Sequence, residues 1–287
     1  MSIVISGAGG QLGRKVVEEL KERVGASEIV ALSRDTGKIA DLGVRTRRAD
    51  FDDREGLVEA FAGAERLLLI STDRIGQRVA QHANAIDAAV RAGVGHLFYT
   101  SVTRATDEGN PAMVAPEHRA TEEALAASGL PFTALRNNLY TDFLLPTAQQ
   151  AIATGVYTSN GGNGGASYVT RDDLATATAA ILAVPAAPRG VLELTGQEAV
   201  TGAQFAAILS ELAGKEIRFQ SLTDEQSAAG MAAAGLPPEM VALYNSFGTA
   251  QCEGYFDLIT DVVQRYLGRT PTSVAAFLTT NRTALVA

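Results

Sequence analysis

Three glycines spaced three residues apart near the start of the chain could bind the phosphates of a dinucleotide. Gly7, Gly10 and Gly13 fit the pattern G-x-x-G-x-x-G. An apolar run over residues 3–5 precedes them, and apolar residues recur at helical spacing over residues 12–24. The glycines therefore lie on a predicted turn between a strand and a helix, which is the setting that a dinucleotide-binding loop requires.

Each part of this loop has its own expected role. Gly7 can take the tight turn, Gly10 lets the backbone approach a pyrophosphate, and Gly13 lets the helix pack closely against the strand. The helix begins near Gln11 and Leu12. Free backbone N–H groups at that helix end, together with the positive end of the helix dipole, are expected to hold the phosphates.

The residues after the second predicted strand indicate which dinucleotide binds. NAD enzymes place a carboxylate there, on the ribose 2′-hydroxyl. In this chain the position is Ser33, and Arg34 follows it. Arg34 offers a charged fork for a 2′-phosphate, and Lys38 adds a second positive charge one helical turn later. We therefore expect NADP(H), although Asp35, one place further on, could serve a ribose instead.

Polar and aromatic side chains stand at the ends of the third to the sixth predicted strands or directly after them. They are Asp50 and Phe51, Ser71 and Thr72, then Tyr99, Thr100 and Ser101, and finally Asn137, Asn138 and Tyr140. Because the carboxyl ends of parallel strands share one edge of a sheet, these groups should line one ligand crevice. We expect Asp50 and Phe51 to contact the adenine, with a turn-forming Asp and a core Phe as the alternative. Ser71 and Thr72 are expected to contact the cofactor, and Asn137 its nicotinamide end.

Strands and helices alternate over the first half of the chain. The predicted strands are residues 3–5, 28–33, 43–50, 66–71, 95–101 and 132–135, and the predicted helices are residues 12–24, 54–62, 76–92 and 116–128. This alternation predicts an α/β fold with a doubly wound parallel sheet of the Rossmann type. The third helix is interpreted as amphipathic, with Val79, Ala83, Ile86 and Val90 on one face.

The regular alternation of strands and helices ends in the second half, where the sequence predicts mostly short helices. We therefore expect a dinucleotide-binding domain over residues 1–137 and a smaller, mostly helical substrate-cleft lobe over residues 138–287. A strand near residues 191–195 can still join the main sheet. Thr270–Pro271 is expected to open the last helix, and the Gly-rich loop 160–165 is either a mobile lid or a wide turn.

Composition excludes several classes of function. The net charge is −8 and no basic run stands out, so nucleic acid is not an expected partner. The single cysteine, Cys252, rules out an internal disulfide, and three scattered histidines do not form a metal-binding pattern. There is no signal peptide and no apolar run long enough for a bilayer, so we expect a cytoplasmic protein without membrane contact. The oligomeric state is open, with a homodimer as one option.

Several of these motifs together resemble the NmrA-like family of atypical short-chain dehydrogenases. The matching segments are residues 6–13, 31–34, 49–51, 67–71, 135–140 and 169–175. The resemblance runs essentially end to end and is nearest to the bacterial NADPH-dependent quinone oxidoreductases (type 2) and the triphenylmethane dye reductases. It implies NADP(H) on the Rossmann half and a substrate cleft covered by the helical half. Gly9 is a mild departure, because a Thr is usual there.

One catalytic motif is absent. Ordinary short-chain dehydrogenases use a Tyr-x-x-x-Lys pair, in which the lysine lowers the pKa of the tyrosine that protonates a carbonyl. Val114 and His118 stand at that spacing here, so alcohol–ketone chemistry is not expected. A quinone accepts a hydride readily and a triarylmethyl cation needs no proton, so the protein mainly has to hold the nicotinamide against its acceptor and exclude water. If a proton donor exists, His118 and Tyr140 are the candidates.

Two kinds of protein fit these features. The first is an enzyme that transfers a hydride from NADPH to a quinone or a similar conjugated acceptor. The second is a non-enzymatic sensor that binds NADP(H) and reports the cofactor ratio to a partner. We favour the enzyme, because no appended partner-binding segment is evident after about residue 280.

Overall fold

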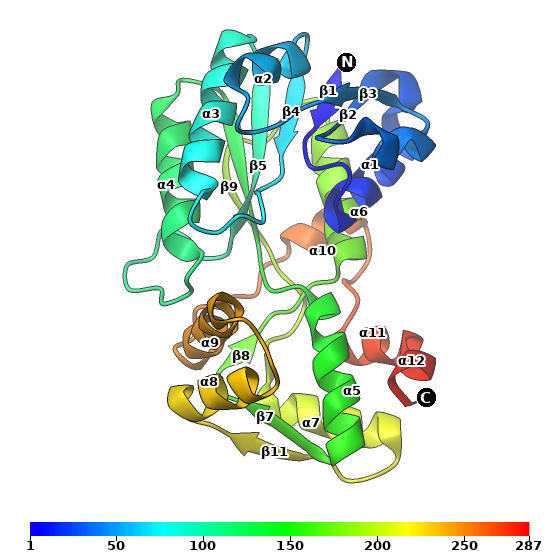
Figure 1. Cartoon of the computed structure of the whole chain (residues 1–287). Coiled ribbons are helices and arrows are strands. Elements are labelled where there is room, and N and C mark those ends of the chain that lie inside the picture. Colours follow the sequence, from blue (N-terminus) through cyan, green and yellow to red (C-terminus); the bar gives the residue numbers. More distant parts are fainter. Residues whose placement is uncertain (287) are drawn as a thin grey trace.

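A parallel sheet of seven strands forms the upper part of the computed structural model, which describes residues 1–286 (Figure 1). The strands of this sheet are β1 (Ile3–Ile5), β2 (Ile29–Ser33), β3 (Arg45–Arg48), β4 (Arg66–Leu69), β5 (His96–Val102), β6 (Phe132–Asn137) and β9 (Gly190–Leu194). Their order is β3-β2-β1-β4-β5-β6-β9, and every neighbouring pair is parallel. The predicted doubly wound fold is therefore confirmed, and the order reverses between β1 and β4. In such sheets a ligand crevice opens beyond the carboxyl ends of the strands at that reversal.

Helices cover both faces of the sheet. One face carries α1 (Gln11–Val24), α6 (Arg171–Ala183) and α10 (Val262–Leu267), and the other carries α2 (Arg54–Phe61), α3 (Arg78–Arg91) and α4 (Ala115–Ala127). Two further short 3₁₀ helices, η1 (Ala26–Glu28) and η2 (Thr36–Leu42), flank β2. Each face has its own apolar core, in which strand residues such as Ile3 and Leu67 are fully buried. Burial on both faces explains why the central strands are continuous apolar runs.

The lower part of the molecule in Figure 1 is built from short helices and two sheets of two strands each. Its helices are η3 (Thr141–Phe143), α5 (Leu144–Thr154), α7 (Gly202–Ala213), α8 (Asp224–Ala233), α9 (Pro238–Cys252), α11 (Val274–Thr280) and α12 (Arg282–Val286). The small sheets pair β7 (Val156–Ser159) with β11 (Arg218–Ser221) and β8 (Gly165–Ala166) with β10 (Val200–Thr201). A separate apolar core, which includes Leu209 and Leu278, joins α5, β7, β10, α7, α11 and α12.

The chain crosses repeatedly between the two parts. The strand predicted near residues 191–195 is β9, which pairs with β6 at the edge of the main sheet. α6 packs against α1, and α10 packs against α6 and β9. Three elements from the range 138–287 thus belong to the layers of the sheet, so the two parts are not separated at one point in the sequence.

Two expectations for the helices were wrong. In α3, Val79 and Val90 are exposed, while the polar side chains of Gln81 and His82 are buried. Here hydrogen bonds to neighbouring polar groups replace apolar packing, so the pattern of apolar residues indicated the wrong face. Pro271 lies before α11, which begins at Val274 after a Ser273 cap whose side chain accepts the N–H of Ala276. The helix is therefore capped by the Ser273 hydroxyl and does not begin at Thr270–Pro271 as expected.

The Gly-rich loop 160–165 is tied to the helix beneath it. Asn160 donates to the carbonyl of Asn245 (2.9 Å) and to Asp224 (2.8 Å). Gln251 donates to the carbonyl of Gly164 (3.0 Å), where any Cβ would overlap the backbone of α9. These contacts favour a packed turn over a mobile lid.

Candidate functional site

The glycine loop joins β1 to α1 at the point where the strand order reverses. Gly7 has φ +64°, a left-handed conformation that favours glycine. Gly10 immediately precedes α1, and its N–H donates to the carbonyl of Gly7 (2.9 Å). A Cβ on Gly13 would overlap that same carbonyl oxygen, so only glycine lets the helix pack here. The loop therefore has the geometry that the sequence predicted.

The start of α1 offers free donors to a ligand. Within residues 1–286, the N–H groups of Gln11 and Leu12 donate to no backbone acceptor, and the first turn of α1 carries no acidic residue. Gln11 is exposed, and Gly10 has no side chain to cover the helix end. Unpaired donors at the positive end of a helix attract an anion, so this surface fits a pyrophosphate.

Two unpaired cations follow β2. Arg34 and Lys38 are both exposed, and their side chains form no ion pair or hydrogen bond within the described chain. Asp35 has a partner, because its carboxylate caps η2 by accepting the N–H of Gly37 (3.0 Å). The carboxylate that could have served a ribose thus has a structural role. The free positive charge beside it fits the phosphate of NADP(H).

The expected adenine contacts also have structural roles. The carboxylate of Asp50 accepts the N–H of Asp52 (3.2 Å), as in a turn. Phe51 is half-buried in the α2–α3 layer, with its ring edge-on to His82 at 6.4 Å between centroids. The turn-forming alternative is therefore present, and contact with adenine stays a prediction.

Polar groups meet at the carboxyl ends of β4 and β5. The N–H of Ser71 donates to Thr100 Oγ1 (2.9 Å), and Thr72 Oγ1 donates to Gln81 (2.9 Å). The hydroxyl of Ser71 lies 3.4 Å from that of Thr100. Ser71 and Thr72 are half-buried, so side-chain contacts already position them at the crevice edge.

Asn137, the last residue of β6, contacts Tyr140, three residues further along the chain. Asn137 is 4% exposed, and its Nδ2 donates to Tyr140 Oη (3.2 Å), while its Oδ1 is buried without a partner. The Tyr140 ring stacks on Phe143, and the Arg171 guanidinium lies 4.8 Å from the Tyr140 centroid. Burial raises the pKa of Tyr140, so its hydroxyl keeps its proton near neutral pH.

His118 is almost completely buried. It is 5% exposed on the first turn of α4, and its Nδ1 lies 2.7 Å from the hydroxyl of Tyr99, which is fully buried. Burial lowers the pKa of His118 well below its usual value, so the imidazole is neutral. No hydrogen bond joins His118 to Tyr140 within the described chain.

A buried ion-pair network lies beside these strand ends, and sequence reasoning did not find it. Arg136 of β6 bonds both oxygens of Glu122 (2.9 and 2.6 Å) and also reaches Glu193 (3.1 Å). Ser101 and Thr103 donate to the two carboxylates. The signal was an arginine directly after the predicted strand 132–135, because a charge that is buried there needs a partner.

The buried histidines make the stability of the protein depend on pH. Burial lowers the pKa of His82 to about 3 and that of His96 to about 4. In the unfolded chain both histidines have the usual pKa of 6.5 and bind protons below that pH. Unfolding therefore takes up protons as the pH falls below 6.5. We expect the free energy of unfolding to drop by about 1.4 kcal/mol per pH unit for each histidine. Equal urea midpoints at pH 7 and pH 5.5 would contradict this expectation.

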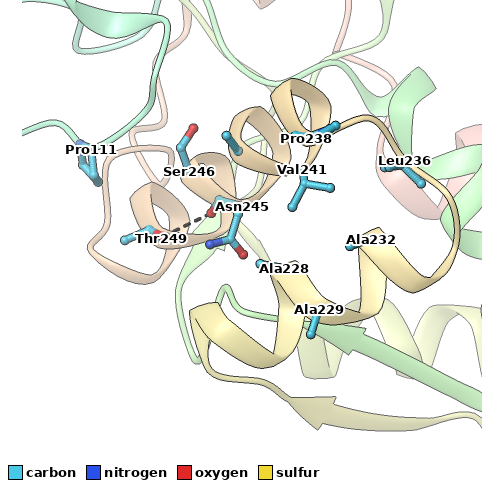
Figure 2. A pocket seen from close by; sticks show the side chains of 11 residues that line it. Pro111, Ala228, Ala229, Ala232, Leu236, Pro238, Val241, Asn245, Ser246 and Thr249 are labelled. Atoms are coloured by element: carbon cyan, nitrogen blue, oxygen red, sulfur yellow. Dashed lines mark hydrogen bonds between the residues drawn. The ribbon is translucent and has the colours of Figure 1, made fainter.

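A cavity of about 680 Å³ lies elsewhere, between α8 and α9 (Figure 2). It is lined by Pro111, Ala228, Ala229, Ala232, Leu236, Pro238, Val241, Ala242, Asn245, Ser246 and Thr249. The lining includes no residue of the glycine loop and none at the ends of β4 or β6, so this cavity is separate from the candidate site. Within residues 1–286 there is also no group of three or more His, Cys, Asp or Glu side chains that could hold a metal ion.

Comparisons with known proteins agree with this geometry. The model of the NmrA-like family matches residues 1–278. Quinone oxidoreductase 2 of Escherichia coli (strain K12) is 38% identical over 277 residues, covering 95% of this chain and 96% of that protein. The crystal structure of a NADPH-dependent quinone oxidoreductase from E. coli complexed with NADPH superposes with a TM-score of 0.93, at 35% identity, covering 99% of this chain and 100% of that one. The triphenylmethane reductase of Citrobacter sp., complexed with NADP(H), gives a TM-score of 0.90 at 34% identity, covering 97% and 100%.

Proposed function

The chain belongs to the NmrA-like family, and from that premise we propose that it is a NADPH-dependent oxidoreductase that transfers a hydride to a quinone or a similar conjugated acceptor. A relative with 38% identity over nearly the whole chain carries the name quinone oxidoreductase, and a similar structure was solved with NADPH. The observation that carries the proposal is the unpaired positive charge of Arg34 and Lys38 after β2, next to a capped Asp35.

Residues from five strand ends would hold the cofactor. Its pyrophosphate would lie on the glycine loop and accept from the free N–H groups of Gln11 and Leu12. Arg34 and Lys38 would bind the 2′-phosphate. The groups assigned to the rest of the cofactor are Asp50 and Phe51 for the adenine, and Ser71, Thr72 and Asn137 toward the nicotinamide. The unpartnered buried Oδ1 of Asn137 supports this fit, because a cofactor amide could supply the missing donor. When bound, the nicotinamide supplies the hydride.

Replacing Arg34 tests the choice of cofactor. We expect Arg34→Ala to weaken NADPH binding about 10- to 100-fold, because a charge-assisted hydrogen bond contributes roughly 1.5–3 kcal/mol. Binding of NADH, which has no 2′-phosphate, should change little. Titration of cofactor fluorescence measures both dissociation constants. Arg265→Ala, on the exposed surface of α10, is the matched control. Equal losses for NADPH and NADH would remove Arg34 from the phosphate site.

The reaction does not need a strong acid in the protein. No tyrosine of the sequence has a lysine four residues later. A hydride added to a quinone leaves a stabilised anion, which water can protonate afterwards. Tyr140, whose hydroxyl stays protonated, would contact the acceptor near Asn137. The neutral His118 would offer a hydrogen bond and not an acidic proton.

Turnover distinguishes this enzyme from a sensor that only binds NADP(H). We expect the purified protein to oxidise NADPH in the presence of a simple quinone and not in its absence. Tight NADPH binding without reduction of any quinone, azo compound or cationic triarylmethane dye would favour the sensor. No helix in the described part of the chain is long and apolar enough to cross a membrane. A cytoplasmic location, a homodimer and the lack of a nucleic-acid partner stay predictions from the sequence.

A further inference from the structure

A chain of hydrogen bonds connects buried rings behind the strand ends. The N–H of Thr72 points to His82 Nε2 (3.2 Å), and His82 Nδ1 lies 2.9 Å from Thr121 Oγ1 and 3.4 Å from Tyr99 Oη. The Tyr99 hydroxyl lies 2.7 Å from His118 Nδ1. His82 and Tyr99 are fully buried, so water does not complete these contacts.

The geometry determines where the proton of His82 lies. A backbone N–H can only donate, so the Nε2 that faces Thr72 must be unprotonated. His82 therefore carries its proton on Nδ1 and donates it to Thr121 Oγ1. The hydroxyl of Thr121 is free to accept, because its own proton goes to the carbonyl of Glu117 (2.8 Å).

The same reasoning then applies to His118. Since His82 Nδ1 is a donor, the Tyr99 oxygen can only accept on that side. The proton of Tyr99 must point the other way, to His118 Nδ1. A neutral His118 thus carries its proton on Nε2. That nitrogen has no hydrogen-bond partner within the described residues. It belongs to a ring on the first turn of α4 that contacts Tyr99, and Tyr99 pairs with Leu69, the last residue of β4.

We propose that Tyr99 and His82 are positioning residues that hold His118 as the Nε2–H tautomer, so that a neutral imidazole offers a fixed N–H to the acceptor oxygen. This role rests on the proposed function. Hydride transfer to a quinone moves two electrons and one proton to it and leaves a negative charge on oxygen. The His118 N–H stabilises that charge by a hydrogen bond and keeps its own proton, and the second proton comes from water.

Burial is the main cause that keeps the imidazole neutral, and the positive charge of Arg78 acts in the same direction. Arg78 of α3 is the cation that faces the cluster, and Glu117 and Glu122 of α4 are the anions. Arg78 Nη1 and Glu117 Oε2 are 3.9 Å apart, so their charges largely offset one another. Burial supports the same protonation state, because it disfavours a charged ring.

Nitrogen-15 NMR of the histidine side chains tests the proposal without any variant. In the wild type we expect His118 to be protonated on Nε2 and His82 on Nδ1, from pH 5 to pH 8. His96 serves as an internal reference. Its Nε2 should be protonated, because Thr133 Oγ1 donates to the carbonyl of Pro188 and so can only accept from His96. A wild-type spectrum with His118 protonated on Nδ1 would overturn the proposal.

Tyr99→Phe links the tautomer to the rate. We expect His118 to lose its single tautomer or to titrate within this pH range, and kcat with a quinone to fall roughly 10-fold or more. The dissociation constant for NADPH should not change. Tyr157→Phe, which removes another buried hydroxyl, is the control and should leave both readouts unchanged. An unchanged tautomer and kcat in Tyr99→Phe would overturn the proposal. A wild-type protein that does not reduce quinones would overturn both the proposed function and the donor role of His118. The NMR spectrum tests the hydrogen-bond chain independently of turnover.

Discussion

A Gly10→Val variant is expected to fold normally and to bind NADPH at least about 100-fold more weakly, a loss of roughly 2.8 kcal/mol. Gly10 has φ −85°, which any residue adopts, and a Cβ there would lie 3.3 Å from the carbonyl oxygen of Gly7. The fold can therefore accept a side chain with a small local shift. A valine would nevertheless project over the helix end where the pyrophosphate is expected, and would keep the phosphates from the N–H groups of α1.

Gly13→Val separates binding from folding. At that position a Cβ would overlap the backbone of Gly7, so we expect the variant to lose stability because α1 can no longer pack against the loop. The measurements are NADPH titration by fluorescence and urea unfolding of both variants. Normal NADPH affinity in a folded Gly10→Val protein would mean that the loop does not bind the pyrophosphate.

The second large effect is expected from Arg136→Met. The Arg136 guanidinium lies between the carboxylates of Glu122 and Glu193, at 2.6 and 3.1 Å, and Arg136 and Glu122 are each less than 10% exposed. Removing the cation leaves a buried carboxylate, Glu122, and a half-buried one, Glu193, without their counter-charge. We expect the free energy of unfolding to fall by about 3–5 kcal/mol, because an uncompensated buried charge is costly.

An exposed ion pair provides the control for Arg136. Arg91 bonds Glu55 at 2.7 Å, but its side chain is 42% exposed and that of Glu55 is 77% exposed. Solvent screening should limit the effect of Arg91→Met to less than about 1 kcal/mol. Urea unfolding of both variants measures the difference. Similar small losses would show that the Arg136 network contributes no more than a surface pair.

The sheet was predictable from the sequence because local patterns determine it. Runs such as residues 67–69 are apolar at every position, as expected for a strand buried on both faces. The glycine loop was predictable for a similar reason, since its three glycines determine the turn and the close packing of residues next to them in the sequence. The doubly wound fold and the start of α1 followed from these short segments.

The polar interior was not predictable in the same way. Arg136 and Glu193 are 57 positions apart, and Tyr99 and His118 are 19 apart on different elements. Nothing local marks such partners. In α3 the valines indicated one face, but hydrogen bonds to Thr72 and Thr121 turn His82 inward instead. The crossings of α6 and β9 back to the sheet likewise depend on contacts between distant segments.

The most direct measurement is the single-turnover rate of NADPH oxidation by a saturating quinone, with deuterium on one or the other face of nicotinamide C4. If the protein transfers a hydride from the bound nicotinamide, deuterium on one face should slow the oxidation clearly, and deuterium on the other face should leave it unchanged. NADH should react much more poorly. Oxidation that does not depend on the quinone, or that proceeds equally fast with both deuterated forms, would contradict hydride transfer in this site.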